Sequence, residues 1–440
     1  MGAVKNASAW VWVPTLYFVE GVPYFVVNNI SVLALTKMGV PNGTMALFTS
    51  LLYLPWIVKP FWSPFVDILR TKRWWIIATE ILMGFLMVGL TLSVPRPAHE
   101  MIEASATSIS LFAPMLCLFW LTAFASATHD IAADGFYMLA LDSRTQAVFV
   151  GIRSMFYRLA SIFGQGGLVA LAGFIELRTG DIPLSWRLTL LCASVLLCLL
   201  TLYHVFVLPC PVRDRSSMAR KSEGASRILV EFGRSFSLFF SKPGVVLAII
   251  FLLFYRLPEA FLIKMCVPFL VATGESGGLA LETAEVGIVY GTIGVCALTV
   301  GGILGGWFAS LRGLKASLWW MAAAMTLPCL TFVYLAIFQP QSIVIVSVAV
   351  AVEQFGYGFG FTAYMLYMMY FSEGTHQTSH YAICTAFMAL SMMLPGMVAG
   401  YMEELLGYVG FFWMVIGCCL ATVVVTLIVS RTVAAGYGRK

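Results

Sequence analysis

The chain has 440 residues, of which 60% are hydrophobic and only 11% are charged, and its mean hydropathy is +0.91. Soluble domains have about a quarter charged residues, so this composition excludes an ordinary soluble enzyme and indicates a lipid bilayer as the main solvent. The net charge of +5 does not indicate a nucleic-acid partner. The ten cysteines form no C-x-x-C pair or histidine-rich metal-binding spacing, so we interpret them as packing residues and expect no metal and no cofactor.

Twelve apolar segments follow one another along the chain. A helix of about 20 apolar residues crosses the hydrocarbon core of a membrane, so the segments predict an all-α membrane protein with about 12 transmembrane helices. In chain order we expect these helices at residues 12–35, 45–64, 74–94, 109–141, 147–175, 186–208, 244–272, 284–310, 315–338, 342–371, 378–402 and 407–430. An even number of spans places both termini on one side of the membrane.

Basic residues are concentrated in alternate connecting segments. If both termini are cytoplasmic, the cytoplasmic segments contain most of the lysines and arginines, whereas the opposite loops contain acidic residues such as Glu100, Glu275 and Glu285. Positively charged loops stay in the cytoplasm during membrane insertion. We therefore predict cytoplasmic termini and an outside loop at about residues 274–285.

The longest hydrophilic stretch, residues 209–243, is basic and lies midway along the chain. We predict an N-terminal six-helix bundle at 1–208, a cytoplasmic linker at 209–243 and a C-terminal six-helix bundle at 244–440. The connections after spans two and eight have related sequences. This relation indicates an internal duplication with a central cavity between the two halves.

Charged residues inside the membrane are concentrated in spans four and five. Asp130 and Asp134 lie one helical turn apart on one face of span four, and span five contains Arg153 and Arg158. Counting the helical rise from the connecting turn places Asp134 at the depth of Arg153 and Asp130 near that of Arg158. The aspartates either exchange a proton during transport or form a fixed structural ion network. His129 could relay protons, but a packed histidine is the favoured interpretation.

Polar side chains also form stripes on spans one and ten, and such a stripe is typical of a helix that faces a cavity. Span seven contains Arg256 and Glu259 three residues apart, and the alternative for this pair is that the two charges screen each other. Helix packing is the alternative for the tyrosines, and snorkelling to the interface is the alternative for Lys59. Glu20 and Glu353 are candidate proton-coupling residues in addition to the charged residues of spans four and five. The candidate substrate-binding residues are Tyr24, Asn28, Asn29, Lys59, Arg256, Glu259, Gln354, Tyr357 and Tyr364.

Several motifs occur in the order and spacing of a known family. They are Lys59-Pro-Phe-Trp-Ser-Pro-Phe-Val-Asp67, Ser126-Ala-Thr-His-Asp-Ile-Ala-Ala-Asp134, Tyr157-Arg-Leu159, Tyr255-Arg-Leu-Pro-Glu-Ala-Phe261 and Pro395-Gly-Met-Val-Ala-Gly400. Together they extend over nearly the whole chain, and they resemble the AmpG muropeptide permeases of the major facilitator superfamily. The chain departs from that family at Glu20 and Asn28 in span one, and after Asp134.

The resemblance implies two pseudo-symmetric six-helix bundles in a bacterial inner membrane. It also implies secondary active transport by alternating access, with anhydro-muropeptides imported together with protons. The superfamily's conformational loop motif falls on Asp67 and Arg70, with Ser310 and Arg312 in the repeated connection. In this mechanism Asp130 or Asp134 carries the coupling proton. The aspartate and an anionic substrate compete for pairing with Arg158 and Arg256.

Other functions remain open from the sequence. A symporter for another anionic or sugar-like solute, such as an acyl-CoA-like compound or an amino sugar, is the main alternative, and a membrane-embedded enzyme or a sensor is disfavoured. An ATP-driven pump is disfavoured because the chain contains no G-x-x-x-x-G-K-[ST] loop. The expected partners are a small-molecule substrate, protons and the lipid bilayer, and the expected oligomeric state is a monomer.

Overall fold

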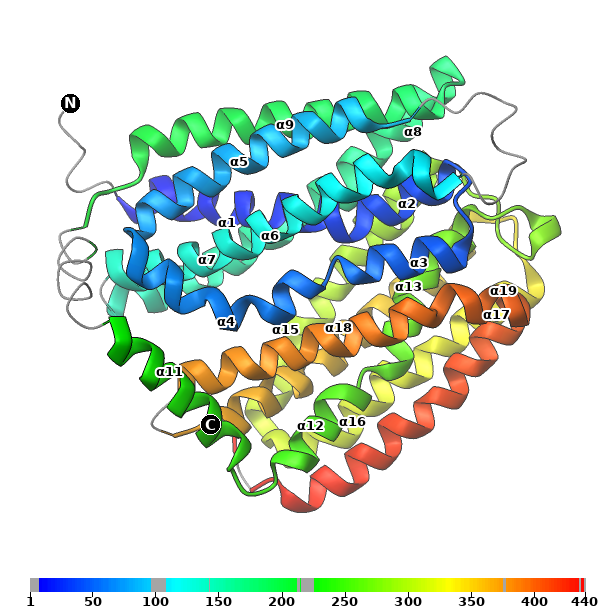
Figure 1. Cartoon of the computed structure of the whole chain (residues 1–440). Helices are drawn as coiled ribbons and strands as arrows, with labels where there is room; N and C mark the ends of the chain where they lie inside the picture. Colours follow the sequence, from blue (N-terminus) through cyan, green and yellow to red (C-terminus); the bar gives the residue numbers. More distant parts are fainter. Residues whose placement is uncertain are drawn as a thin grey trace. The chain divides into compact units, whose positions relative to one another are not determined.

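The computed structural model describes residues 8–95, 108–141, 143–211, 214, 225–374, 377–434 and 437–438. Within these residues every regular element is a helix, and 11 helical segments are long and apolar enough to cross a membrane (Figure 1). The predicted all-α membrane architecture is therefore confirmed. The chain divides into two compact units: unit 1 is Met1–Ala34, Met38–Val40 and Val58–Phe232, and unit 2 is Leu35–Lys37, Pro41–Ile57 and Gly233–Lys440.

Unit 1 is built from long helices, two of which contain a π-helical turn. In chain order its elements are α1 (Ala9–Phe25), η1 (Val26–Ile30), α2 (Ser31–Lys37), α4 (Leu54–Leu69), α5 (Lys72–Ser93), α6 (Ser108–Ala140), α7 (Ser143–Ser161), η3 (Ile162–Leu168), α8 (Val169–Thr179) and α9 (Ile182–Val207). The last three residues of α2 and the first four of α4 belong to unit 2.

Unit 2 contains several spans that are divided into shorter helical pieces, together with the long helices α18 and α19. Its elements are α3 (Asn42–Leu51), α11 (Ala225–Phe240), α12 (Val245–Phe254), α13 (Leu257–Val271), η4 (Gly274–Ser276), α14 (Thr283–Ile288), η5 (Val289–Gly294), α15 (Val295–Arg312), α16 (Leu314–Thr326), η6 (Leu327–Cys329), α17 (Leu330–Phe338), α18 (Ile343–Ser372) and α19 (Gln377–Thr432). The division between the units falls within α11.

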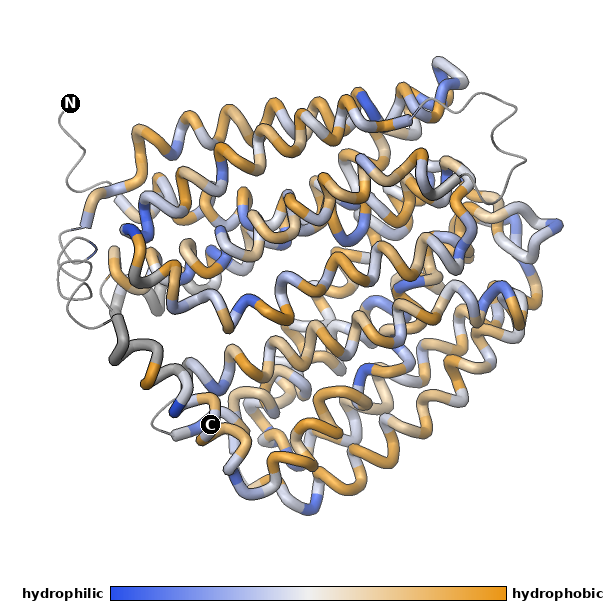
Figure 2. Tube along the Cα trace, in the orientation of Figure 1, coloured by the Kyte–Doolittle hydropathy of each residue, from blue (hydrophilic) through white to orange (hydrophobic). Residues whose placement is uncertain are grey.

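The helices follow from the apolar runs of the sequence. Figure 2 shows hydrophobic residues along most of each helix, with isolated hydrophilic residues inside several of them. Large apolar side chains such as Phe85, Leu92 and Leu405 are about three-quarters exposed. In water such exposure would be unfavourable, but hydrocarbon chains solvate these side chains, so the apolar surface is suited to a bilayer.

In unit 1, α5 packs along both α6 and α9, and α1 packs along α7. Figure 1 shows α5 and α9 running side by side. A buried cluster that includes Trp12, Tyr17, Phe136 and Phe149 joins α1, α6 and α7. The ring of Trp12 meets the ring of Phe136 edge to face, with centroids 5.2 Å apart. This packing fixes the positions of the charged residues that α1 and α6 bear.

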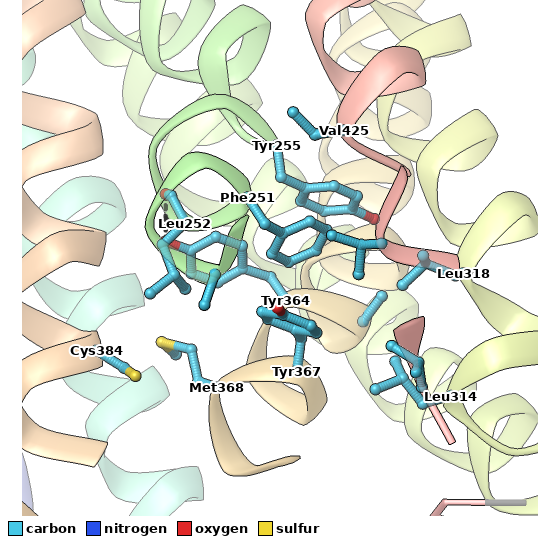
Figure 3. Close-up of a cluster of buried hydrophobic side chains, with 14 of the residues drawn as sticks. Phe251, Leu252, Tyr255, Leu314, Leu318, Tyr364, Tyr367, Met368, Cys384 and Val425 are labelled. Atoms are coloured by element: carbon cyan, nitrogen blue, oxygen red, sulfur yellow. Dashed lines mark hydrogen bonds between the residues drawn. The ribbon is translucent and has the colours of Figure 1, made fainter. Parts of the chain in front are cut away.

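In unit 2, small residues allow helices to approach closely. A Cβ atom at Gly358 of α18 would lie 2.1 Å from the carbonyl oxygen of Leu298 in α15, so only glycine fits at this contact. Phe251 of α12, Tyr255 just after α12, and Tyr364 and Tyr367 of α18 form an aromatic cluster (Figure 3). The Tyr364 hydroxyl donates to the carbonyl of Leu252 at 2.7 Å.

The last element, α19, has a single non-helical residue, Gly407, with φ 65° and ψ 166°. The chain reverses direction there, so that residues 377–406 and 408–432 run back past each other (Figure 1). A positive φ is readily adopted only by glycine, which accounts for the residue type at the turn.

The first prediction concerns the contact between α3 and α19. A Cβ at Gly400 would lie 2.0 Å from the carbonyl oxygen of Asn42, whereas a Cβ at Gly417, in the second helical segment of α19, would meet no atom within 4 Å. We expect Gly400→Ala to lower the free energy of unfolding by on the order of 1–3 kcal/mol, because backbone cannot move away cheaply. Thermal unfolding in detergent measures the change.

Gly417→Ala is the matched control for this contact. Alanine is a better helix former than glycine, by about 0.5–1 kcal/mol, so this variant should be as stable as the parent or more stable. Equal stability of the Gly400 and Gly417 variants would contradict the close approach.

Candidate functional site

The charged residues of unit 1 meet around α6. Asp134 accepts a hydrogen bond from Arg153 Nη2 at 2.7 Å, and the Tyr17 hydroxyl donates to the same oxygen at 3.1 Å. The Arg153 guanidinium also lies over the Tyr17 ring, 4.3 Å from its centroid. The predicted proximity of Asp134 and Arg153 is confirmed. Asp134 and Arg153 lie on two consecutive helices joined by a short turn. Residues at similar distances from that turn lie at similar depths, so these two side chains meet.

Asp130, one turn away on α6, forms an ion pair with Lys59 of α4. The sequence analysis compared depths only within the α6–α7 hairpin and therefore associated Asp130 with Arg158. It did not predict the pair of Asp130 with Lys59. Lys59 has a partly buried side chain, which reaches the carboxylate inside unit 1. The expectation that Lys59 might only extend to the membrane interface is therefore wrong. Arg158 lies half-buried on α7, one to two turns beyond Arg153.

Glu20 of α1 is the third carboxyl of this group. It interacts electrostatically with Asp130 and Asp134, and with the cations Arg153 and Lys59. Its Oε2 atom is buried and has no hydrogen-bond partner. The acidic network of unit 1, by which we mean Glu20, Asp130 and Asp134 with Lys59 and Arg153, thus holds two carboxylates in ion pairs and one carboxyl with an unsatisfied oxygen.

The polar stripe of span one continues into the π-helical turn η1. Asn28 donates to the carbonyl of Tyr24 at 3.1 Å, and Asn29 donates to Gln165 Oε1 at 3.1 Å. Gln165 lies in the second π-helical turn of unit 1, η3, and donates onward to Ser161 at 2.8 Å. The sequence analysis missed Gln165. Short π-helical turns inside α-helices occur frequently at functional sites.

In unit 2, span seven is broken at its centre. The helix stops after Phe254 and starts again at Leu257, and Arg256 lies at the break with non-helical φ and ψ of −102° and 11°. Its guanidinium lies over the rings of Phe361 and Tyr357, and its Nη2 donates to the Tyr357 hydroxyl at 2.5 Å. The sequence analysis named Arg256 and Tyr357 as candidate substrate-binding residues but did not predict their contact. The break itself was not predicted.

Two further carboxyls lie beside this arginine. Glu259 and Glu353 are buried, and they interact with each other. Gln354 donates to Glu353 Oε2 at 2.8 Å. Both oxygens of Glu259 and Oε1 of Glu353 are buried with no hydrogen-bond partner of ordinary geometry. Tyr364 is completely buried in the aromatic cluster of Figure 3. Its ring lies under Arg256, with 5.6 Å between the guanidinium carbon and the ring centroid.

The residues of the proposed conformational motif lie at helix ends. Arg70 stacks over Trp74 at 5.7 Å, and Arg312 stacks over Phe308 at 5.0 Å. The Ser310 hydroxyl donates to the carbonyl of Trp307 at 2.7 Å. The side chain of Asp67 lies outside the described residues. The role of this motif stays a prediction.

The sequence analysis also missed a buried polar cluster in unit 1. Glu80 of α5 lies between His129 of α6 and His204 of α9, and all three side chains are fully buried. Glu80 is an acidic residue within a predicted span, and that signal could have identified it. His204 near the end of span six gave no comparable signal.

Comparisons with solved structures define the fold. The chain aligns with a D-xylose–proton symporter at a TM-score of 0.72 and 13% identity, covering 98% of both chains. It aligns with a bacterial homologue of the human lysosomal transporter Spinster at a TM-score of 0.67 and 15% identity, again over 98% of both. The chain therefore has the fold of a major facilitator superfamily transporter and is a multi-pass membrane protein.

The sequence comparison finds similar transporters. It is 24% identical over 406 residues to a Rickettsia conorii transporter designated AmpG 4, covering 90% of both chains. It is 22% identical over 437 residues to the anhydromuropeptide permease of Escherichia coli strain K12, covering 95% of this chain and 79% of the permease. No family model matches the chain. The chain thus resembles the AmpG muropeptide permeases in sequence over nearly its whole length, and these relatives are transporters rather than enzymes.

The second prediction tests the pair at the centre of the unit 1 network. Arg153→Gln removes the cationic partner of Asp134 and leaves an unpaired carboxylate, so we expect lower stability than in the double variant Asp134→Asn/Arg153→Gln. Because both side chains are partly exposed, the coupling free energy should be on the order of 1–2 kcal/mol. A double-mutant cycle of thermal unfolding measures it. A coupling near zero would contradict the pair.

Proposed function

We propose that the protein imports anhydro-muropeptides, or related cell-wall sugars and peptides, together with protons across a bacterial inner membrane. Transport proceeds by alternating access. The observation that carries this proposal is the acidic network of unit 1, in which two carboxylates are paired with cations and a third, Glu20, has a buried oxygen with no hydrogen-bond partner. The likeness to anhydromuropeptide permeases over nearly the whole chain supports the choice of substrate.

The network suits proton coupling for an electrostatic reason. A carboxylate inside a membrane protein is stable only with a cation, a proton or water nearby. Lys59 and Arg153 are engaged by Asp130 and Asp134, so a proton is the simplest way to neutralise Glu20. When a substrate anion pairs with one of the cations instead, the aspartate that loses its partner also requires a proton for neutralisation. Proton and substrate would then load together, which is the requirement for symport.

Substrate recognition is assigned to arginine and aromatic side chains. A muropeptide has carboxylates, which an arginine can bind through two parallel hydrogen bonds, and sugar rings, which pack on tyrosine faces. Arg256 provides for both kinds of contact. Its Nε is buried with no hydrogen-bond partner and is available to a carboxylate, and its guanidinium lies over the aromatic rings of Tyr357 and Phe361. It also lies at the start of the half-helix α13, where the positive end of the helix dipole favours an anion. Arg158 is the proposed counterpart in unit 1.

The topology is also part of the proposal. Gly407 separates two apolar segments within α19, and counting both gives twelve spans. With the basic segment 209–243 in the cytoplasm, both termini are cytoplasmic as well. The two six-helix halves are assigned to residues 1–208 and 244–440, and the protein acts as a monomer.

The third prediction identifies the coupling carboxyl. Glu20→Gln, Asp130→Asn and Asp134→Asn each remove one negative charge while preserving shape. We expect at least one of them to abolish gradient-driven accumulation in reconstituted vesicles while retaining substrate exchange without a gradient, because exchange needs no net proton movement. A panel of anhydro-muropeptides, amino sugars and acyl-CoA compounds is tested as substrates in the same vesicles.

Glu275→Gln, at an exposed position of the loop after α13, is the matched control and should transport normally. If all three network variants accumulate substrate like the parent, the network is structural, and Glu353 is the next candidate. If only amino sugars or acyl-CoA compounds are accumulated, the muropeptide assignment is wrong while proton coupling stands.

The fourth prediction concerns orientation. Ser276 is exposed in the short helix after α13. In a background without the native cysteines, Ser276→Cys should react with a membrane-impermeant thiol reagent applied to intact cells. Labelling that occurs only after the cytoplasmic side is opened would reverse the proposed topology.

A further inference from the structure

The buried cluster of Glu80, His129 and His204 has no part in the network proposed for coupling. Glu80 Oε1 lies 2.7 Å from His204 Nδ1 and 3.2 Å from His129 Nε2. His204 Nε2 lies 3.0 Å from the Thr15 hydroxyl. The cluster thereby links four helices of unit 1: α5, α6, α9 and α1.

The hydrogen bonds of the cluster determine how many protons it holds. A carboxylate only accepts hydrogen bonds, so both histidines must donate to an ionised Glu80. The Thr15 hydroxyl donates to the carbonyl of Trp12 at 3.2 Å, which leaves its oxygen to accept from His204 Nε2. His204 then donates from both ring nitrogens and is an imidazolium. The alternative puts the same proton on Glu80, whose hydroxyl donates to a neutral His204.

Both arrangements contain one proton more than an ionised glutamate with two neutral histidines. Without that proton, Thr15 would have to turn its hydroxyl from Trp12 to His204, and Glu80 would keep an unbalanced negative charge. All three side chains are fully buried, so water cannot stabilise that charge. Glu80 Oε2 and His129 Nδ1 already lack hydrogen-bond partners. The proton is therefore required for a neutral cluster.

Within the described part of the chain, the ion-pair partners of Glu80 are His204 and His129. The other ionisable groups on the four helices that the cluster links are Tyr17, Glu20 and Tyr24 of α1, Lys72 and Arg73 of α5, Cys117, Asp130, Asp134 and Tyr137 of α6, and Arg187, Cys192, Cys198 and Tyr203 of α9. No group of three histidine, cysteine or acidic side chains in the described residues has metal-binding geometry.

We propose that Glu80, His129 and His204 form a proton-binding site in unit 1 that holds one proton separately from the acidic network. The two sites lie on adjoining faces of α6, because the consecutive residues His129 and Asp130 turn to different partners, Glu80 of α5 and Lys59 of α4. With the proton bound, the cluster has no net charge, and its hydrogen bonds join α1, α5, α6 and α9. This proposal does not depend on which substrate is transported.

Spectroscopy of the full chain in lipid nanodiscs, without substrate, locates the proton. Nitrogen-15 NMR of histidine-labelled protein distinguishes imidazolium from neutral imidazole, and infrared spectra with labelled glutamate detect a protonated carboxyl. At neutral pH we expect either an imidazolium or a protonated glutamic acid that is absent from Glu80→Gln. His380→Gln is the matched control, because His380 is a buried histidine of unit 2 whose Nε2 contacts the carbonyl of Ser235. Two neutral histidines together with an ionised Glu80 would overturn the proposal.

Stability measurements give an independent test. Proton binding to the folded protein should stabilise it, so the stability of the parent relative to Glu80→Gln should fall as pH rises and the proton leaves. The folding equilibrium constant would change by up to about tenfold per pH unit in that range. If Glu80→Gln does not fold, Glu80→Met/His204→Phe replaces the pair by apolar groups and serves in its place. A stability difference that does not vary with pH, while the fold is retained, would contradict a titratable site.

Discussion

Neutralising buried charge is the constraint on which the arrangement of unit 1 depends. An unpaired charge inside a membrane protein costs several kcal/mol, so each acidic residue needs a partner on a neighbouring helix. Asp134 brings α6 to α7 and α1 through Arg153 and Tyr17, and Asp130 brings α6 to α4 through Lys59. These contacts determine the rotation of α6 about its axis, because the two aspartates lie on one face. In unit 2, Arg256 is accommodated by aromatic faces and a tyrosine hydroxyl.

The spans were predictable because bilayer thickness sets a minimum apolar length, and the hydropathy of the sequence records it directly. The Asp134–Arg153 pair was predictable for a similar reason, since a short turn fixes the relative depth of two consecutive helices. Lys59 and Asp130 are 71 residues apart, and Glu80 and His204 are 124 apart. Such pairs depend on which nonconsecutive helices are neighbours, and hydrophobic periodicity contains no information about that.

Local breaks in the helices were harder to predict than the helices. Pro258 lies just after the interruption at Arg256, but Pro14, Pro23 and Pro114 lie inside helices that continue. A proline therefore does not identify the break on its own. Tyr255 at the interruption is stabilised by contacts from elsewhere in unit 2, including a hydrogen bond from Thr422 to its carbonyl at 2.9 Å. Tertiary contacts of this kind satisfy backbone groups that a regular helix would have used, and they cannot be inferred from a local window.

The π-helical turn at Val26–Ile30 has a consequence for how span one tolerates change in length. A π-helical turn accommodates one more residue than an α-helical turn, so it acts as an insertion absorbed within a continuous helix. Deleting one residue there would allow a regular α-helix, and the hydrophobic length would hardly change. Because the turn already absorbs that residue, the side chains on either side of the deletion would keep nearly the same relative orientation. A one-residue deletion in the α-helical part of the span would instead rotate every side chain beyond it by roughly 100°. Span one is therefore most tolerant of a one-residue change in length at this turn.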